Sequence, residues 1–222
     1  DPALLEELDL FSRQEAMHTR QHVAFNDAIR KFGFDVDRIE RNTRRFMRLL
    51  EKCLTRRAAL AVTVFLEHLT TMLAETGYRF PEFRTEWDRR ARDFWTWHGL
   101  EELEHKAVAF DVFERVGGGY LTRVSAALML LVVIALLPLT LVGDWVRFAR
   151  YPSDKPARTL SDTFRQNPTL RRRTLGFFLG YLFTYFKPGF HPWNNDSRDH
   201  VERWLAEINP TLETAKTPTP SS

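Results

Sequence analysis

A helical repeat of apolar residues, broken by glycine and proline, is the feature that most limits how this chain can fold. Within the first 116 of its 222 residues, apolar side chains recur at intervals of three and four. No alternating strand pattern with hairpin turns precedes the triple glycine at 117–119. The repeat places apolar side chains on one face of each helix, and that face must pack against other helices to leave water. The sequence therefore predicts an all-α fold built around a helical bundle.

Glycine and proline divide this repeat into four predicted helices. The third, which contains AALAVTVFLEHLTTMLAE, is apolar on nearly every face and is predicted to be the central, most buried helix. The four helices are predicted to cover residues 1–33, 35–54, 56–76 and from Pro81 to about Val116, with stops at Gly33, Gly77 and Gly117.

Two apolar stretches follow the triple glycine. Residues 124–142 (VSAALMLLVVIALLPLTLV) carry no charge and reach the length of a membrane span, whereas residues 175–186 (LGFFLGYLFTYF) are too short to span alone. A hairpin of both would place their basic connector on the translocated side, against the positive-inside rule. We therefore expect a membrane-associating helical pair that dips into one leaflet. The alternative is a buried helix of a soluble protein.

The connector also indicates a partner. From Asp144 to Arg173, eight basic residues stand against three acidic ones, a local net charge of +5 in a chain whose total is +3. This charge lies beside the most apolar segment and in no nucleic-acid motif, so we expect an anionic membrane surface and no nucleic acid. Cys53 is the one cysteine, which excludes a disulfide framework and indicates a reducing compartment. The expected location is the cytoplasmic side of the inner membrane.

Three parts are expected along the chain. Residues 1–118 would form the helical bundle, and residues 119–190 the apolar helical pair with its connector. Residues 191–222 would form a turn, a short amphipathic helix and a disordered tail, TAKTPTPSS.

The stretch HGLEELEH at residues 98–105 carries a candidate metal motif. His98, Glu102 and His105 share one helix face, and Glu101 lies just outside it. An exposed acidic stripe would give the same spacing. Glu102 is the expected ligand, because it lies four residues after His98 and three before His105. Glu101 is expected to hold a ligand histidine in place.

A second stretch, QEAMHTRQH, repeats this arrangement. Glu15, His18 and His22 share one face, so a Glu-x-x-His step occurs twice in the chain. Between the two steps, Glu67 lies in the middle of the apolar third helix. A carboxylate there is costly to bury unless it is paired or bound to a metal.

This inventory is typical of di-iron and di-manganese carboxylate bundles, in which one helical turn offers a carboxylate and an imidazole to the metals. The ferritin-like order is Glu, Glu-x-x-His, Glu, Glu-x-x-His, and the first Glu is missing here. We expect it on a helix upstream of Asp1, so the chain is interpreted as N-terminally truncated. The expected metal ligands are Glu15, His18, His22, Glu67, His98, Glu102 and His105.

The histidines differ in expected role. His18 and His105 are the expected terminal ligands, whereas His22 and His98 are either third nitrogen ligands or nearby core histidines. His68 is expected to point away from the metals. His191 is expected to lie outside the site, packed in a turn on Trp193. We also expect three residues outside the site to face solvent: Asp196, Asp199 and His200.

Over most of its length the sequence resembles a bacterial family of predicted metal-dependent hydrolases that belongs with ferritin-like proteins. The stretches that carry the resemblance are FSRQEAMHTRQHVAFN, FLEH, WHGLEELEHKAVAFDVF and YFKPGFHPWNND. The resemblance implies a ferritin-like fold and metal-dependent hydrolysis. The metal motifs are also similar to those of multicomponent di-iron oxygenases, and His98, Glu102 and His105 resemble the ligands of di-iron arylamine N-oxygenases.

Two reaction classes fit these motifs. In the favoured one, two divalent metal ions, expected to be iron, activate O2 to oxidise a small hydrophobic or amine substrate, with an electron-donor protein. In the alternative, a metal-bound hydroxide hydrolyses an ester or phosphoester. A non-catalytic metal-binding protein is a third option, and manganese or zinc would suit the same ligands. The chain lacks the Gly-x-Ser-x-Gly elbow of serine hydrolases and a phosphate-binding loop.

Overall fold

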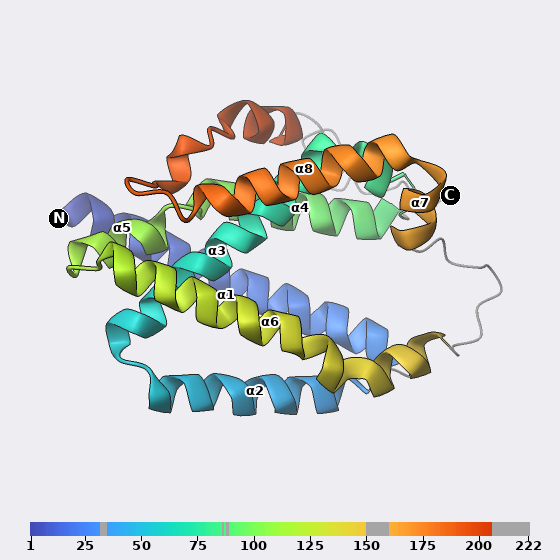
Figure 1. The fold of residues 1–222 in the computed structure, drawn as a ribbon, viewed down its shortest axis with the longest axis horizontal. Coiled ribbons are helices and arrows are strands. Elements are labelled where there is room, and N and C mark those ends of the chain that lie inside the picture. Colours follow the sequence, from blue (N-terminus) through green and yellow to red (C-terminus); the bar gives the residue numbers. More distant parts are fainter. Residues whose placement is uncertain (32–34, 86, 88, 150–159, 206–222) are drawn as a thin grey trace, which may run out of the picture. The chain divides into compact units, whose positions relative to one another are not determined.

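The structure is a computed structural model that describes residues 1–31, 35–85, 87, 89–149 and 160–205, with the backbone alone at residues 29, 137–149, 160 and 161 (Figure 1). Its described residues form helices and turns and include no strand. The all-α expectation is therefore confirmed, while a ferritin-like arrangement stays a prediction. The elements are α1 (Pro2–Lys31), α2 (Val36–Cys53), α3 (Arg56–Arg79), η1 (Pro81–Phe83), α4 (Arg89–His105), α5 (Val108–Arg115), α6 (Tyr120–Ala149), α7 (Leu160–Gln166), α8 (Pro168–Thr184) and η2 (Pro192–Asn194).

The chain divides into two compact units, and each combines distant parts of the sequence. One unit comprises residues 1–65 and 108–159, and the other comprises residues 66–107 and 160–222. The first contains α1, α2, α5, α6 and the start of α3. The second contains the rest of α3 with α4, α7 and α8. The expected three-part division at residues 118 and 190 stays a prediction.

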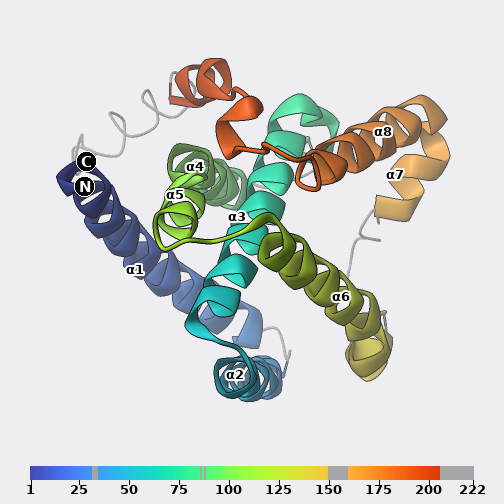
Figure 2. The same ribbon diagram turned by 60° about the vertical axis from the view of Figure 1, so that its left-hand side comes forward.

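In the first unit, α1 packs against both α5 and α2 (Figure 2). Asp35 caps α2 by accepting a hydrogen bond from the backbone N–H of Arg38 at 3.1 Å. Two glycines end α5: Gly117 adopts a φ of +77°, and a Cβ on Gly118 would lie 2.5 Å from the ring of Phe113. Both positions require glycine, which confirms the predicted stop at the triple glycine.

In the second unit, the core joins α3, α4 and a short helical segment at residues 198–205. Ala74, Leu100, Leu103 and Trp204 pack together and are almost completely buried. α8 also packs on α3, because the ring of Tyr181 lies 4.9 Å from that of His68, and the ring of Phe177 lies 5.9 Å from that of Phe80, the residue that follows α3. The predicted short C-terminal helix therefore exists, and it is part of the core.

Two predicted boundaries are wrong. α3 does not stop at Gly77 but continues to Arg79, because a helical Gly77 has open space around it and Pro81 provides the stop. The predicted fourth helix is instead three elements, η1, α4 and α5, with a turn at Lys106 and Ala107. This turn coincides with the burial of the Lys106 side chain, whose partners are described below.

The apolar stretch 124–142 lies within α6, and the stretch 175–186 begins in α8. Among the described residues, α3 is the one helix long and apolar enough to cross a membrane, and 56% of its apolar window is buried inside the protein. The described apolar part of α6, Tyr120–Leu136, is shorter. The side chains at 137–142, part of the connector and the expected disordered tail lie outside the described residues, so membrane association stays a prediction.

Candidate metal centre

The first Glu-x-x-His step lies on one face of α1. His18 is 3% exposed, and its Nδ1 lies 3.4 Å from Oε1 of the half-buried Glu15. One turn further on, the ring of His22 lies 6.4 Å from the ring of His18. Burial, and then the charge of His18, lowers the pKa of His22, and Glu15 opposes this effect. The lowered pKa favours the neutral imidazole, which is the form that binds metals.

The second step lies on the buried side of α4. Glu102 and His105 are both buried, and His98 Nε2 lies 3.5 Å from Glu102 Oε1. The rings of Phe94 and Trp95 lie 6.1 Å and 5.3 Å from the ring of His98. These aromatic surroundings exclude water, and polar contacts are stronger where water is excluded.

α3 brings a further carboxylate to this step. Glu67 Oε2 lies 3.3 Å from His105 Nδ1, and the Glu67 side chain is 12% exposed. The fully buried Thr71 hydroxyl lies 2.6 Å from the Glu67 carbonyl oxygen and 3.4 Å from the Glu102 carbonyl oxygen. Thr71 thus ties the backbones of α3 and α4 together beside the two carboxylates.

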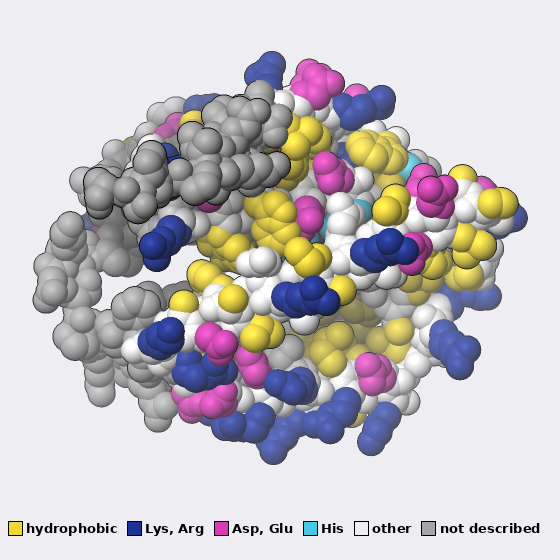
Figure 3. Space-filling model, turned by 180° about the vertical axis from the view of Figure 1, so that it is seen from behind, with side chains coloured by type: hydrophobic (Ala, Val, Ile, Leu, Met, Phe, Trp, Pro, Cys, Tyr) yellow, Lys and Arg dark blue, Asp and Glu magenta, His cyan; other side chains and the backbone are white. Residues whose placement is uncertain are grey.

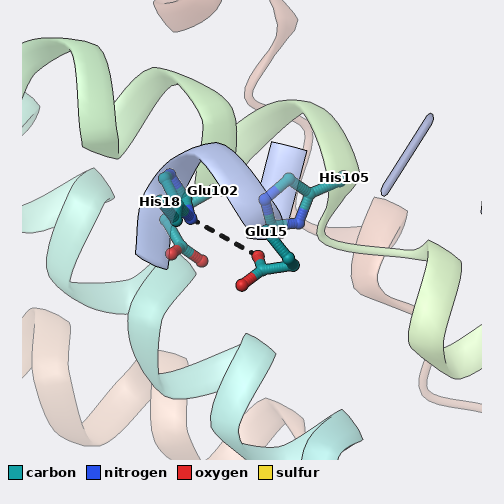
Figure 4. A group of neighbouring side chains, drawn as sticks. All are labelled: Glu15, His18, Glu102 and His105. Atoms are coloured by element: carbon teal, nitrogen blue, oxygen red, sulfur yellow. Dashed lines mark ion pairs between the residues drawn. The ribbon is translucent and has the colours of Figure 1, made fainter. Parts of the chain in front are cut away.

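Glu15, His18, Glu102 and His105 form one group of neighbouring side chains (Figure 4). Each offers one ligand atom, and these atoms lie within 4.8 Å of one another. Glu15 is half-buried and the other three are buried. Two carboxylates and two imidazoles are donors that zinc, iron and manganese accept. All four residues come from the two Glu-x-x-His steps.

The other predicted ligands lie next to this group. His22, His98 and Glu67 each neighbour one of its members, at the distances given above. Glu101 is half-buried on α4, and its expected role beside a ligand histidine stays a prediction. The assignment of each of these side chains as a ligand also stays a prediction.

The comparisons with known proteins identify a family for the chain. Residues 1–196 match the family described as predicted metal-dependent hydrolase. The chain belongs to this family. No curated protein and no solved structure matches it. The family resemblance expected from the sequence is therefore confirmed, while the resemblance to ferritin-like proteins and to di-iron oxygenases stays a prediction.

In this member of the family, α8 and the segment that follows it anchor the residue after Glu67. His68 is 5% exposed, and its ring lies 4.9 to 5.3 Å from the rings of Tyr181, Tyr185 and Phe190. Its Nε2 lies 3.2 Å from the carbonyl oxygen of Tyr181. His68 is a core residue with a partner on α8, in agreement with the expectation that it points away from the metals.

The same segment anchors the residue that follows His105. Lys106 is 2% exposed, and its amine donates hydrogen bonds to the Asn195 carbonyl oxygen and the Ser197 hydroxyl. Its Nζ also lies 4.4 Å from the centre of the Trp193 ring. Because Lys106 is directly bonded to His105, these contacts restrain the end of α4 that carries the second Glu-x-x-His step. Both anchors use the stretch YFKPGFHPWNND, which sequence analysis linked to the family but not to the metal centre.

One expectation in this region is wrong. His200 does not face solvent: its side chain is 15% exposed, its Nδ1 lies 2.9 Å from Glu75 Oε2, and its ring stacks on Tyr78 at 4.0 Å. Glu75 is itself 1% exposed and pairs with Arg79 at 3.0 Å. Burial is the largest cause of a lowered pKa at His200.

Of the remaining expectations outside the centre, the exposure of Asp196 and Asp199 is confirmed, and the packing of His191 on the Trp193 ring stays a prediction. Asp196 and Asp199 are exposed, and His191 occupies a turn, where its Nδ1 accepts a hydrogen bond from the backbone N–H of Trp193 at 3.2 Å. Sequence reasoning did not find Glu75, although a carboxylate two turns after Glu67 on the most apolar helix was an available signal.

Proposed function

We propose that this protein is a metal-dependent hydrolase whose divalent metal is held by Glu15, His18, Glu102 and His105. The observation that supports this proposal most strongly is the group of four ligand atoms within 4.8 Å of one another. The family description supports hydrolysis as the reaction class. The substrate class we propose is an ester or phosphoester.

The residues present fit a divalent metal ion. Two carboxylates balance its charge, and two imidazoles supply the nitrogen donors that zinc, iron and manganese share. When bound, the metal supplies a Lewis acid that polarises the substrate and lowers the pKa of water to near neutrality. Glu67, His22 and His98 would be the candidate ligands of a second ion; with one ion bound, Glu67 and His98 orient the donors instead.

The chain's own residues orient these donors. Glu67 lies 3.3 Å from His105 Nδ1, so in our proposal the carboxylate holds that nitrogen and directs Nε2 of the same ring toward the metal. His98 restricts the rotation of the Glu102 carboxylate in the same way, from 3.5 Å. Thr71 maintains the distance between α3 and α4 at this level. Removing such orienting partners typically costs about 10-fold to 100-fold in metal affinity or activity.

Sequence analysis favoured O2-dependent oxidation at a di-iron centre, and the comparisons support the hydrolytic alternative better. The two chemistries use the same donor types, and turnover distinguishes them.

Metal content tests the site. We expect the full chain, purified without added metal, to contain a divalent transition metal. His18→Ala and His105→Ala should each lower the bound metal per chain, because each removes one nitrogen donor. His200→Ala is the matched control, since it removes a largely buried histidine outside the group. Wild-type metal content in both ligand variants would refute the proposed site.

Turnover tests the reaction class. We expect the metal-loaded chain to cleave model esters or phosphoesters without O2, and His105→Ala to lose this activity. An iron-loaded chain that cleaves none of them, and whose absorbance changes when O2 is added to the reduced protein, would support the oxidative alternative instead.

A further inference from the structure

α8 carries apolar residues on two opposite sides, and one side is already packed. Leu170 and Tyr181 are buried, the Tyr181 ring packs against His68 of α3, and the Phe177 ring packs against Phe80, which follows α3. A helix of a water-soluble protein that buries one apolar face normally presents polar residues on the other. In α8 the opposite face therefore needs an explanation.

That opposite face is a stripe of large apolar side chains. Leu175, Leu179 and Phe183, which we call the α8 stripe, follow one another at four-residue intervals and are 51%, 53% and 60% exposed. Arg171 and Arg172 lie on the same face one turn earlier and are exposed. In the part of the chain that the structure describes, neither arginine pairs with a carboxylate. Along α8, this face therefore begins with two arginines and continues with three large apolar side chains.

α6, in the other unit, has an exposed apolar face of its own. Leu121, Leu128, Val132 and Leu136 share one side of the helix and are 52% to 76% exposed. Ala127 and Leu130, on the packed side, are buried. No charged residue interrupts the exposed face between Leu121 and Leu136. Exposed apolar faces of this kind mark surfaces that contact a membrane or a partner.

Two other helices are weaker candidates for this contact. α3 has the length of a membrane span, but it is largely buried and carries Glu67. α2 is basic, and Figure 3 shows its Lys and Arg side chains along the lower edge of the view. Part of that charge is already paired, because Arg44 lies 3.0 Å from Glu40. Arg41 and Arg45 lie on the side of α2 opposite its apolar side, which includes Leu50, and they serve below as control positions.

We propose that the α8 stripe binds the surface of an anionic lipid bilayer, and that the exposed face of α6, in the other unit, is a second apolar surface of the same kind. Arg171 and Arg172 contact lipid phosphates, and the apolar side chains that follow them enter the acyl region. Charge complementarity supports this occupant, since residues 144–173 carry a net charge of +5 and include both arginines. This inference does not depend on the proposed hydrolase activity, and it would bring the metal centre to substrates at a membrane.

Vesicle sedimentation with the full chain tests the α8 stripe. The chain should sediment with vesicles that contain phosphatidylglycerol, and less with vesicles of phosphatidylcholine alone. The triple variant Leu175→Ser, Leu179→Ser, Phe183→Ser should lower the partition coefficient at least about tenfold, because three exposed side chains lose their apolar burial. The matched control replaces exposed residues of α1: Leu5→Ser, Leu10→Ser, Val23→Ser. Equal loss in both triple variants, or loss in neither, would overturn the proposal.

Replacement of Arg171 and Arg172 tests the contribution of the positive charge at the beginning of this face. Arg171→Gln with Arg172→Gln should weaken binding to anionic vesicles by up to about 30-fold. Arg41→Gln with Arg45→Gln removes the same charge from α2 and should leave binding nearly unchanged. Greater loss from the α2 pair than from the α8 pair would assign the contact to α2 and refute our assignment.

A fluorescent label tests insertion even if a serine variant fails to fold. In a Cys53→Ser background, an environment-sensitive dye on Leu179→Cys should shift to shorter wavelength when anionic vesicles are added, and a dye on Leu49→Cys in α2 should not. An unshifted dye at 179 contradicts insertion. The proposal also fails if the stripe variant converts a wild-type dimer to a monomer without vesicles, because a second copy of the chain would then cover the stripe.

Discussion

The side-chain amine of Lys106 is buried in the core, next to the candidate metal centre. Burial lowers its pKa from 10.5 to about 8, although the negative charge of Glu75 opposes this shift. Hydrogen bonds to Asn195 and Ser197 offset part of the cost of burying the charged form. At neutral pH the protein therefore folds around a charge that the unfolded chain would keep in water.

This buried lysine predicts a specific pH dependence of stability. Between pH 8 and 10.5 the unfolded chain binds more protons at Lys106 than the folded chain, so the free energy of unfolding increases with pH across this window. A shift of this size corresponds to about 3 kcal/mol. Urea denaturation of Lys106→Met should lack the increase, whereas Lys52→Met, at an exposed position of α2, should retain it. The same increase in Lys106→Met would show that other groups cause it.

At the scale of elements, the 198–205 helix packs on α4 through a glycine. A Cβ on Gly99 would lie 2.8 Å from Cζ3 of Trp204 and 3.3 Å from Cβ of Ala74. Trp204 is 2% exposed and belongs to the same core cluster, so the ring has little freedom to move. The absence of a side chain at residue 99 therefore determines how closely the two helices approach.

Gly99→Ala should accordingly destabilise the protein by about 1 to 3 kcal/mol, because it overpacks this contact. Gly77→Ala is the matched control on α3, where an added Cβ meets nothing within 4 Å. Replacing that helical glycine should instead stabilise the protein by up to about 1 kcal/mol. Chemical denaturation measures both changes, and a Gly99→Ala variant as stable as wild type would contradict the observed packing of Trp204.

At the scale of the whole molecule, the proposed metal should stabilise the fold, because the unfolded chain does not hold four donors together. A free metal concentration 100-fold above the dissociation constant adds about 2.7 kcal/mol. For a chain of this length, this gain raises the melting temperature by roughly 5 to 10 °C. A chelator should reverse the rise, and His105→Ala should not show it. A melting temperature that is insensitive to metal in the wild type would argue against a shared site.

The sequence by itself determined the features that depend on neighbouring residues. Helix positions follow from apolar spacing and from local stops, so α1, α2 and the break at Gly117 were predictable. The two Glu-x-x-His steps were predictable for the same reason, because residues three apart share a helix face wherever that helix lies. The stretches that contain these steps also carry the resemblance to the family, whose description matches residues 1–196.

The tertiary structure alone decided what is buried and which distant residues meet. His200 was expected to face solvent. Its side chain is instead largely buried, because Glu75, 125 residues earlier, supplies its partner. The helical repeat is interrupted by a turn at Lys106, whose amine bonds to a segment about 90 residues later. The exposure of the α8 stripe was likewise decided by the tertiary structure. Apolar spacing shows that a face exists, whereas packing determines whether another element covers it.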